Sequence, residues 1–160
     1  MLRNFGLASV AIILFAADRF SKYLMLKLPR TEGVFDWPFV SLTPVLNPGL
    51  SFSLPFPNLL TALLTAAIII FLVYLLIKSP GRQINWPLTL IIIGAFSNLF
   101  DRIKLGGVLD FINLPFWPLF NLADSYIAIG ALWLILALRK SYSSALKTAS
   151  GSRTKQEDSR

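Results

Sequence analysis

The sequence predicts a polytopic α-helical membrane protein with four transmembrane helices and a small extracytoplasmic β-sheet between helices 1 and 2. Three observations predict this fold class. The 160 residues are 55% hydrophobic and only 14% charged, and the mean hydropathy is +0.66. A soluble domain of this size would need more polar surface, whereas one compact unit in a membrane would not. Apolar segments recur along the chain, and a proline-rich interval with strand-forming residues separates the first two.

Four segments have the apolar composition of membrane-spanning helices, namely residues 5–26, 59–77, 86–100 and 119–138. A cleaved signal peptide is the alternative interpretation of the first segment. No small-residue cleavage site precedes its charged residues, and its helical pattern continues past them, so we favour a helix. Asn58 is expected to cap the second helix, and Pro87 suits the first turn of the third.

The intervals between these segments predict the remaining structure. The first outer loop, residues 28–57, is too long for a simple turn, and its residues 39–43 and 50–54 have the composition or alternation of short strands. The second outer loop, residues 106–118, is aromatic, as expected at a membrane interface. Residues 141–160 are polar and predict a disordered cytoplasmic tail, which leaves residues 1–140 as a single membrane-embedded domain.

Charge and composition limit the topology and the chemistry. Four spans place both termini on one side, and the basic ends of the turn from Lys78 to Arg82 make that side cytoplasmic by the positive-inside rule. The net charge of +7 comes mainly from short loops and the tail, which favours anionic lipid over nucleic acid. The chain has no cysteine or histidine, which excludes disulfides, thiolate metal sites and a Ser-His-Asp triad.

Two aspartates make the strongest candidate for catalytic chemistry. Asp110 and Asp124 flank the short aromatic part of the second outer loop, and both can face one pocket at the membrane interface. Two carboxylates held close cannot both ionise readily, so one can accept a proton from water while the neutral one polarises a peptide carbonyl. The alternative is a solvated loop aspartate together with an aspartate that is paired with Arg102 or Lys104.

The end of the third segment carries further polar residues. Asn98 and Arg102 are four residues apart and therefore share a helix face, on which Gly94 permits close approach of another helix. They either fix the following loop and orient Asp110, or they provide ordinary helix-end polarity with an ion pair between Asp101 and Arg102.

Two other groups lie in the first half of the chain. Asp18 and Lys22 share a helix face, and we expect them to pair as a structural anchor for the outer loop. A Ser-Lys dyad of Ser21 and Lys22 is disfavoured because adjacent helical residues point in different directions. Asn47 and Gly49 predict a turn, either a plain one or one that presents polar groups to an extended substrate.

Together these residues resemble the bacterial lipoprotein signal peptidase family, also called signal peptidase II. Four boxes occur in the family's order between residues 18 and 125. They are Asp18-Arg-Phe-Ser-Lys22, Asn47-Pro-Gly49-Leu-Ser51-Phe52, Gly94-x-x-x-Asn98-x-x-Asp101-Arg102-x-x-x-Gly106-x-Val108-x-Asp110-Phe111 and Phe120-Asn121-Leu-Ala-Asp124-Ser125. The departures are mild: Arg19 replaces the usual glutamine, Pro48 and Ser51 vary the second box, and the interval between Asp110 and Asn121 is short.

The resemblance implies an aspartic endopeptidase that removes signal peptides from diacylglyceryl-modified prolipoproteins, cutting just before the lipid-modified cysteine. It implies that Asp110 and Asp124 are catalytic. It gives supporting or substrate-contacting roles to Asn47, Gly49, Asn98, Arg102 and Asn121, and structural polar roles to Asp18, Lys22 and Asp101. It also implies an active site at the outer face of the cytoplasmic membrane. The expected partners are the prolipoprotein signal peptide with its diacylglyceryl cysteine and membrane lipid, with no nucleic acid, metal or cofactor.

Three other functions fit the sequence less well. A small four-span multidrug transporter with Asp18 as its proton-coupled site would need little structure outside the membrane, whereas the first outer loop is long. A non-catalytic membrane scaffold would not need Asp110 and Asp124 together. A presenilin-type protease would carry a Gly-x-Gly-Asp signature, which this sequence lacks.

Overall fold

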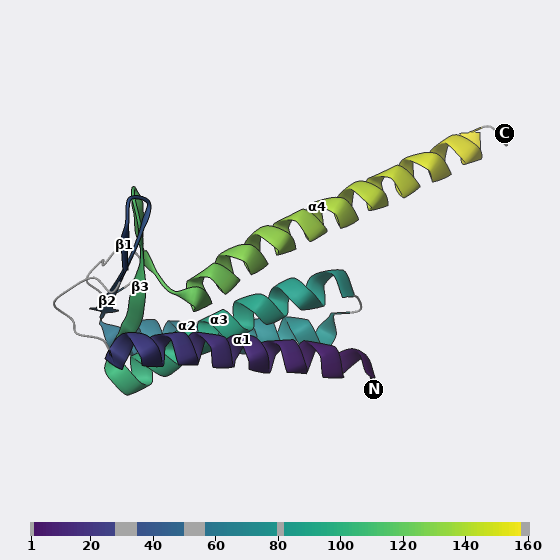
Figure 1. Cartoon of the computed structure of the whole chain (residues 1–160). Coiled ribbons are helices and arrows are strands. Elements are labelled where there is room, and N and C mark those ends of the chain that lie inside the picture. Colours follow the sequence, from purple (N-terminus) through teal and green to yellow (C-terminus); the bar gives the residue numbers. More distant parts are fainter. Residues whose placement is uncertain (1, 28–34, 50–56, 80–81, 158–160) are drawn as a thin grey trace.

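The computed structural model describes residues 2–27, 35–49, 57–79 and 82–157, which form helices and one small sheet (Figure 1). The helices are α1 (Leu2–Lys27), α2 (Asn58–Lys78), α3 (Arg82–Leu105) and α4 (Leu122–Glu157). The strands are β1 (Phe35–Trp37), β2 (Val40–Asn47), β3 (Val108–Leu114) and β4 (Trp117–Phe120). The first three helices contain their predicted segments. α4 begins three residues later than predicted, because residues 119–120 belong to β4.

α3 is the central helix, since it contacts α1, α2 and α4, and its contact with α4 is the most extensive. Two glycines allow the backbones of α3 and α4 to approach closely. A Cβ atom on Gly94 would collide with the carbonyl oxygen of Ala123, and one on Gly130 would lie 2.8 Å from the carbonyl oxygen of Pro87. Small residues have this function at helix interfaces in membranes.

Among the described residues, two helical stretches are long and apolar enough to cross a membrane, namely α2 (Asn58–Lys78) and the part of α4 from Leu122 to Ser144. Only 6% of the α2 span is buried inside the molecule, so its apolar surface faces outward as contact with lipid requires. α1 and α3 carry charged residues towards the ends that are nearer the sheet, namely Asp18, Arg19 and Lys22 in α1 and Asp101, Arg102 and Lys104 in α3.

The four strands form one antiparallel sheet in the order β1-β2-β3-β4, although α2 and α3 lie between β2 and β3 in the chain. The strand predicted at residues 39–43 is confirmed as part of β2, and the one predicted at residues 50–54 lies outside the described residues. The second outer loop is a β-hairpin, which corrects the prediction of an aromatic loop. The sheet is therefore shared by both intervals and does not lie only between the first two helices. β3 joins it because Leu109 and Phe111 bury their side chains against Met25 of α1.

Exposed aromatic side chains lie at one end of this sheet. The pairing of Ser41 with Asn113 places the β1–β2 turn beside the β3–β4 turn. At these turns Trp37, Phe39, Phe116 and Trp117 are largely exposed.

The C-terminal segment differs from its prediction. Residues 141–157 continue α4 as a helix that projects away from the other elements (Figure 1), whereas the sequence predicted a disordered tail. Extending an existing helix requires no new nucleation, so a polar segment can continue it without tertiary packing.

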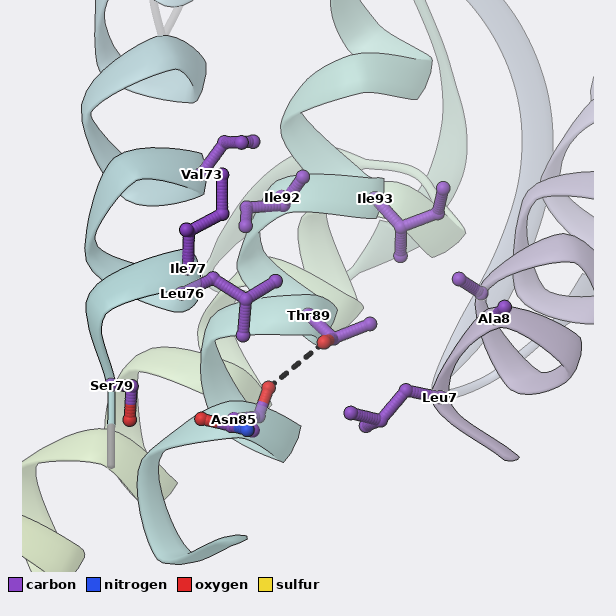
Figure 2. A pocket seen from close by; sticks show the side chains of 11 residues that line it. Leu7, Ala8, Val73, Leu76, Ile77, Ser79, Asn85, Thr89, Ile92 and Ile93 are labelled. Carbon is purple, nitrogen blue, oxygen red and sulfur yellow. Dashed lines mark hydrogen bonds between the residues drawn. The ribbon is translucent and has the colours of Figure 1, made fainter. Parts of the chain in front are cut away.

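A groove of about 550 Å³ lies between α1, α2 and α3, at the end of the helices that is away from the sheet. Figure 2 shows Leu7 of α1 facing the groove opposite Ile77 of α2, with Ile93 of α3 beside them. The hydroxyl group of Thr89 donates to the carbonyl oxygen of Asn85 (2.8 Å). The lining of this groove is mainly apolar and includes no carboxylate, so the candidate active site lies elsewhere.

Candidate active site

The structure brings Asp110 and Asp124 to one site at the end of α3 that is nearer the sheet. Asp110 lies on β3, and Asp124 is the third residue of α4. Asn121 contacts both of them, since its Nδ2 donates to Asp110 Oδ1 (2.7 Å) and its backbone N–H donates to Asp124 Oδ2 (3.1 Å). One fully buried residue therefore holds the two carboxylates, which we call the carboxylate pair.

Asp124 is positioned by the start of α4. Asn121 Oδ1 accepts a hydrogen bond from the backbone N–H of Asp124 (3.0 Å), while Asp124 accepts from the backbone N–H of Asn121. This reciprocal pattern is a capping box, with aspartate in the third helical position. From α1, Asp18 Oδ1 accepts from the backbone N–H of Ala123 (3.0 Å). Asp124 therefore lies in the first turn of the helix, and not about five residues into it as the sequence predicted.

All four oxygens of the carboxylate pair accept hydrogen bonds from uncharged groups. Besides the two bonds from Asn121, Asn47 Nδ2 donates to Asp110 Oδ2 (3.2 Å), and Asn98 Nδ2 donates to Asp124 Oδ1 (2.7 Å). The supporting residues Asn47, Asn98 and Asn121 therefore contact the pair directly. The alternative in which Asp124 pairs with Arg102 or Lys104 is not seen among the described contacts.

The environment of Asp110 favours its neutral form. Burial raises the pKa of Asp110 to about 6, and the nearby charge of Asp124 acts in the same direction. Hydrogen bonds from Asn47 and Asn121 and the charge of Lys22 oppose this shift but do not cancel it. An acid with a pKa near 6 can exchange its proton close to neutral pH, as general acid–base catalysis requires.

Arg102 connects the Asn47–Gly49 turn to the helices. Its Nη2 donates to the carbonyl oxygen of Gly49 (2.9 Å), and the backbone N–H of Gly49 donates to Asn47 Oδ1 (3.1 Å). Asn58 Nδ2 donates to the carbonyl oxygen of Arg102 (3.0 Å). Asn58 is the first residue of α2 and makes no side-chain cap, so its predicted capping role is wrong. The side-chain amide of Asn58 instead binds the last turn of α3 through the carbonyl oxygen of Arg102. The sequence did not predict this role.

A second polar group lies beside the carboxylate pair, and we call it the charged cluster: Asp18, Arg19, Lys22 and Asp101. Lys22 contacts Asp18 (3.0 Å) as predicted, and it also contacts Asp101 (2.7 Å). Arg19 contacts Asp101 (2.6 Å) and Asp18 (2.8 Å). The alternative in which Asp101 pairs with Arg102 is not seen among the described contacts, because Arg19 and Lys22 of α1 pair with Asp101 instead.

The contribution of Arg19 was also missed by the sequence analysis, although its departure from the usual glutamine was a signal. Its guanidinium lies over the rings of Phe15 and Phe100, with 5.7 and 5.2 Å to the ring centroids. Such contacts stabilise a cation in an apolar environment. Asp18 is fully buried and accepts hydrogen bonds from Ser97 and Ala123, which does not fit the exposed proton-coupled site of a transporter.

Two carboxylates joined by a buried asparagine at the polar end of an apolar helical bundle are the site of a helical membrane enzyme with acid–base chemistry. The chain belongs to the signal peptidase II family, since its residues 10–140 match the family model described as signal peptidase (SPase) II. The predicted family is thereby confirmed. The match ends where the predicted tail begins.

Similar proteins agree with this assignment. The lipoprotein signal peptidase of Caldanaerobacter subterraneus subsp. tengcongensis is 40% identical over 130 residues, covering 78% of this chain and 89% of that protein. The lipoprotein signal peptidase of Halothermothrix orenii is 37% identical over 138 residues, covering 81% and 92%. A bacterial membrane enzyme solved by the in meso method at 2.3 Å resolution superposes with a TM-score of 0.81 at 28% identity, covering 87% of this chain and 90% of that chain.

Proposed function

We propose that this protein removes the signal peptide of diacylglyceryl-modified prolipoproteins by cutting just before the lipid-modified cysteine, with Asp110 and Asp124 as its catalytic pair. One observation carries the proposal: in a member of the signal peptidase II family, a single buried asparagine holds two carboxylates at the polar end of the bundle. Asn47, Gly49, Asn98, Arg102 and Asn121 support this site or contact the substrate.

The mechanism follows from the different protonation states of the pair. The ionised carboxylate accepts a proton from a water molecule, whose oxygen attacks the scissile carbonyl carbon. The neutral carboxylic acid donates its proton to the carbonyl oxygen, which gives a tetrahedral gem-diol intermediate. As the carbon–nitrogen bond breaks, the carboxyl group that took the proton of the water gives it to the leaving nitrogen, and a hydroxyl proton of the intermediate returns to the other carboxylate. The raised pKa of Asp110 supports a shared proton near neutral pH, while the amide donors stabilise the charge of the ionised partner.

The location of basic residues supports the orientation in the membrane. Lys78, Arg82, Arg139 and Lys140 lie at the end of the helices that is away from the carboxylate pair. If that end is cytoplasmic by the positive-inside rule, four spans place the site at the outer face of the cytoplasmic membrane. The exposed aromatic residues at the sheet turns suit the interface on that side.

This placement suits the proposed substrate. A prolipoprotein is anchored by its signal helix and by its acyl chains, so its scissile bond lies near the boundary between lipid and water. The carboxylate pair, on β3 and in the first turn of α4, is positioned to contact the scissile bond at that depth. The proposed partners are therefore the lipid-modified signal peptide and the surrounding lipid, with no metal in the reaction.

The test is cleavage of a diacylated prolipoprotein by purified protein in detergent or lipid. Asp110→Asn and Asp124→Asn should each lower the rate by at least about 10²- to 10⁴-fold, because an amide replaces neither the base nor the acid. Substrate binding should persist. The double variant should lose little more than either single variant, since the two groups act as a unit.

Asp36→Asn is the matched control, because Asp36 is an exposed carboxylate of β1 in the same sheet. It should retain the wild-type rate. Near-normal cleavage by either Asp110→Asn or Asp124→Asn would exclude the aspartic mechanism.

A further inference from the structure

Lys22 connects the charged cluster to the carboxylate pair. Its Nζ lies 2.7 Å from Asp101 Oδ2, 3.0 Å from Asp18 Oδ2 and 3.2 Å from Asn98 Oδ1. The contacts with the two carboxylates are ion pairs, and the contact with Asn98 is a hydrogen bond that the ammonium group donates. The lysine side chain is only 3% exposed, which leaves little room for water to replace these partners. The ion pairs lie within the charged cluster, and the hydrogen bond connects the cluster to Asn98.

The bond to Asn98 determines which way its carboxamide faces. An ammonium can only donate, so the Asn98 oxygen must face Lys22 and its Nδ2 must face Asp124 Oδ1 (2.7 Å). Asn121 Nδ2 donates to the same Asn98 oxygen (3.2 Å) and to Asp110 Oδ1 (2.7 Å). Lys22 and the carboxylate of Asp124 therefore favour the same orientation of the Asn98 carboxamide, whereas the Asn121 carboxamide is oriented by the backbone N–H of Asp124, which donates to its Oδ1.

We propose that Lys22 is a positioning residue for the carboxylate pair, which it controls by fixing the orientation of the Asn98 carboxamide. This inference rests on the proposed peptidase function and goes beyond the structural anchoring of the outer loop. Without the cation, the Asn98 oxygen keeps only the donor from Asn121 (3.2 Å), so the carboxamide is held less firmly. Its Nδ2, which holds Asp124 Oδ1, is then less well placed.

The charge of Lys22 also acts on the pair. Lys22 and the carboxylate pair belong to one group of neighbouring charges. The other charged groups are Asp18 and Arg19 on α1 and Asp101 and Arg102 on α3, and the pair itself is Asp110 on β3 and Asp124 on α4. Within this environment the ammonium lowers the pKa of Asp110. Its removal therefore shifts the acidic limb of the pH–rate profile to higher pH, because the ionised form of the pair loses a stabilising charge.

Lys22→Met and Arg19→Met form a matched pair for the test. Each substitution removes one cation from the charged cluster, so the two variants have clusters of equal net charge. Only Lys22, however, contacts Asn98. Both variants should show a similar loss of thermal stability. Lys22→Met should lower kcat by about 10- to 100-fold with little change in KM, as expected for misplaced catalytic groups. It should also shift the acidic limb upward, whereas Arg19→Met should keep the kcat and the pH profile of the wild type.

A charge-balanced comparison covers the case in which Lys22→Met does not fold. Asp101→Asn keeps the contact between Lys22 and Asn98, and Lys22→Met combined with Asp101→Asn restores a neutral cluster without that contact. The double variant should show the lower kcat and the shifted profile relative to Asp101→Asn. Equal kcat and equal pH profiles within both comparisons would overturn the positioning role, while wild-type cleavage still supports the peptidase. Absence of cleavage by the wild type would overturn both.

Discussion

At the residue scale, the two carboxylates reach the same site by different routes. Asp124 is positioned locally by the capping box that begins α4. Asp110 depends on the sheet, where it pairs with Val45 of β2 and is 4% exposed. The donors around both are amides and backbone N–H groups. A guanidinium in their place would favour ionisation of both acids, so uncharged donors preserve the shared proton that the proposed mechanism needs.

The pKa of Asp110 predicts a pH dependence of stability with a definite sign. Its folded value of about 6 lies above the ordinary value of 3.8, so the folded state binds more protons between these two values. The stability that Asp110 contributes is complete below the ordinary value and is lost as the pH rises through about 6. In thermal unfolding from about pH 4 to pH 7, Asp110→Asn should gain stability relative to the wild type as the pH rises. A relative loss over this range would contradict the raised pKa.

At the scale of elements, the contact between α3 and α4 positions the site. Gly94 lies one helical turn before Asn98 and faces the backbone of Ala123, which is next to Asp124. Since a Cβ atom on Gly94 has no room, the approach of the two helices depends on this glycine. The distance between Asn98 and Asp124 therefore depends on the fit of the backbones as well as on the side chains.

Gly94→Ala should separate α3 from α4, which destabilises the protein by about 1–3 kcal/mol and reduces cleavage. Gly6→Ala in α1 is the matched control, because nothing lies within 4 Å of its added Cβ. It should leave cleavage unchanged and raise stability by at most about 1 kcal/mol through helix propensity. Equal stability and activity in the two variants, measured by thermal unfolding and cleavage, would show that the close approach is not needed.

At the scale of the whole molecule, the site and the C-terminal segment are far apart along α4. The family match ends at residue 140, and the helix beyond it projects away from the other elements (Figure 1). Truncation after residue 143 should therefore preserve membrane insertion and the cleavage rate. A truncated protein that is inserted but inactive would contradict this expectation.

The proposed topology is tested by single cysteines in this cysteine-free chain. Gln83→Cys, at the exposed start of α3, should be labelled from outside only after the membrane is permeabilised. Asn113→Cys, on the exposed part of β3, is the matched position on the opposite side and should be labelled in intact cells. Labelling in the reverse order would show that the orientation is inverted.

Local sequence patterns were enough to predict the helices and to single out the two carboxylates. The helices follow from local hydropathy, because their backbone hydrogen bonds close within each segment. The carboxylates follow from motif spacing, and the Asn47–Gly49 turn from side-chain bonds to the nearby backbone. Each of these features depends on neighbours in the chain, which a sequence pattern displays directly.

Which polar side chains pair with one another depends on the tertiary structure. Arg19 and Asp101 are 82 positions apart, and Asn47 and Asp110 are 63 apart. The hairpin of β3 and β4 was missed for the same reason, since β3 is completed by pairing with distant β2. The partner of a buried charge is the opposite charge that helix packing places beside it. In the same way, a strand pairs with the strand that the fold places beside it. Such choices depend on how the helices pack around α3, and local sequence patterns do not encode them.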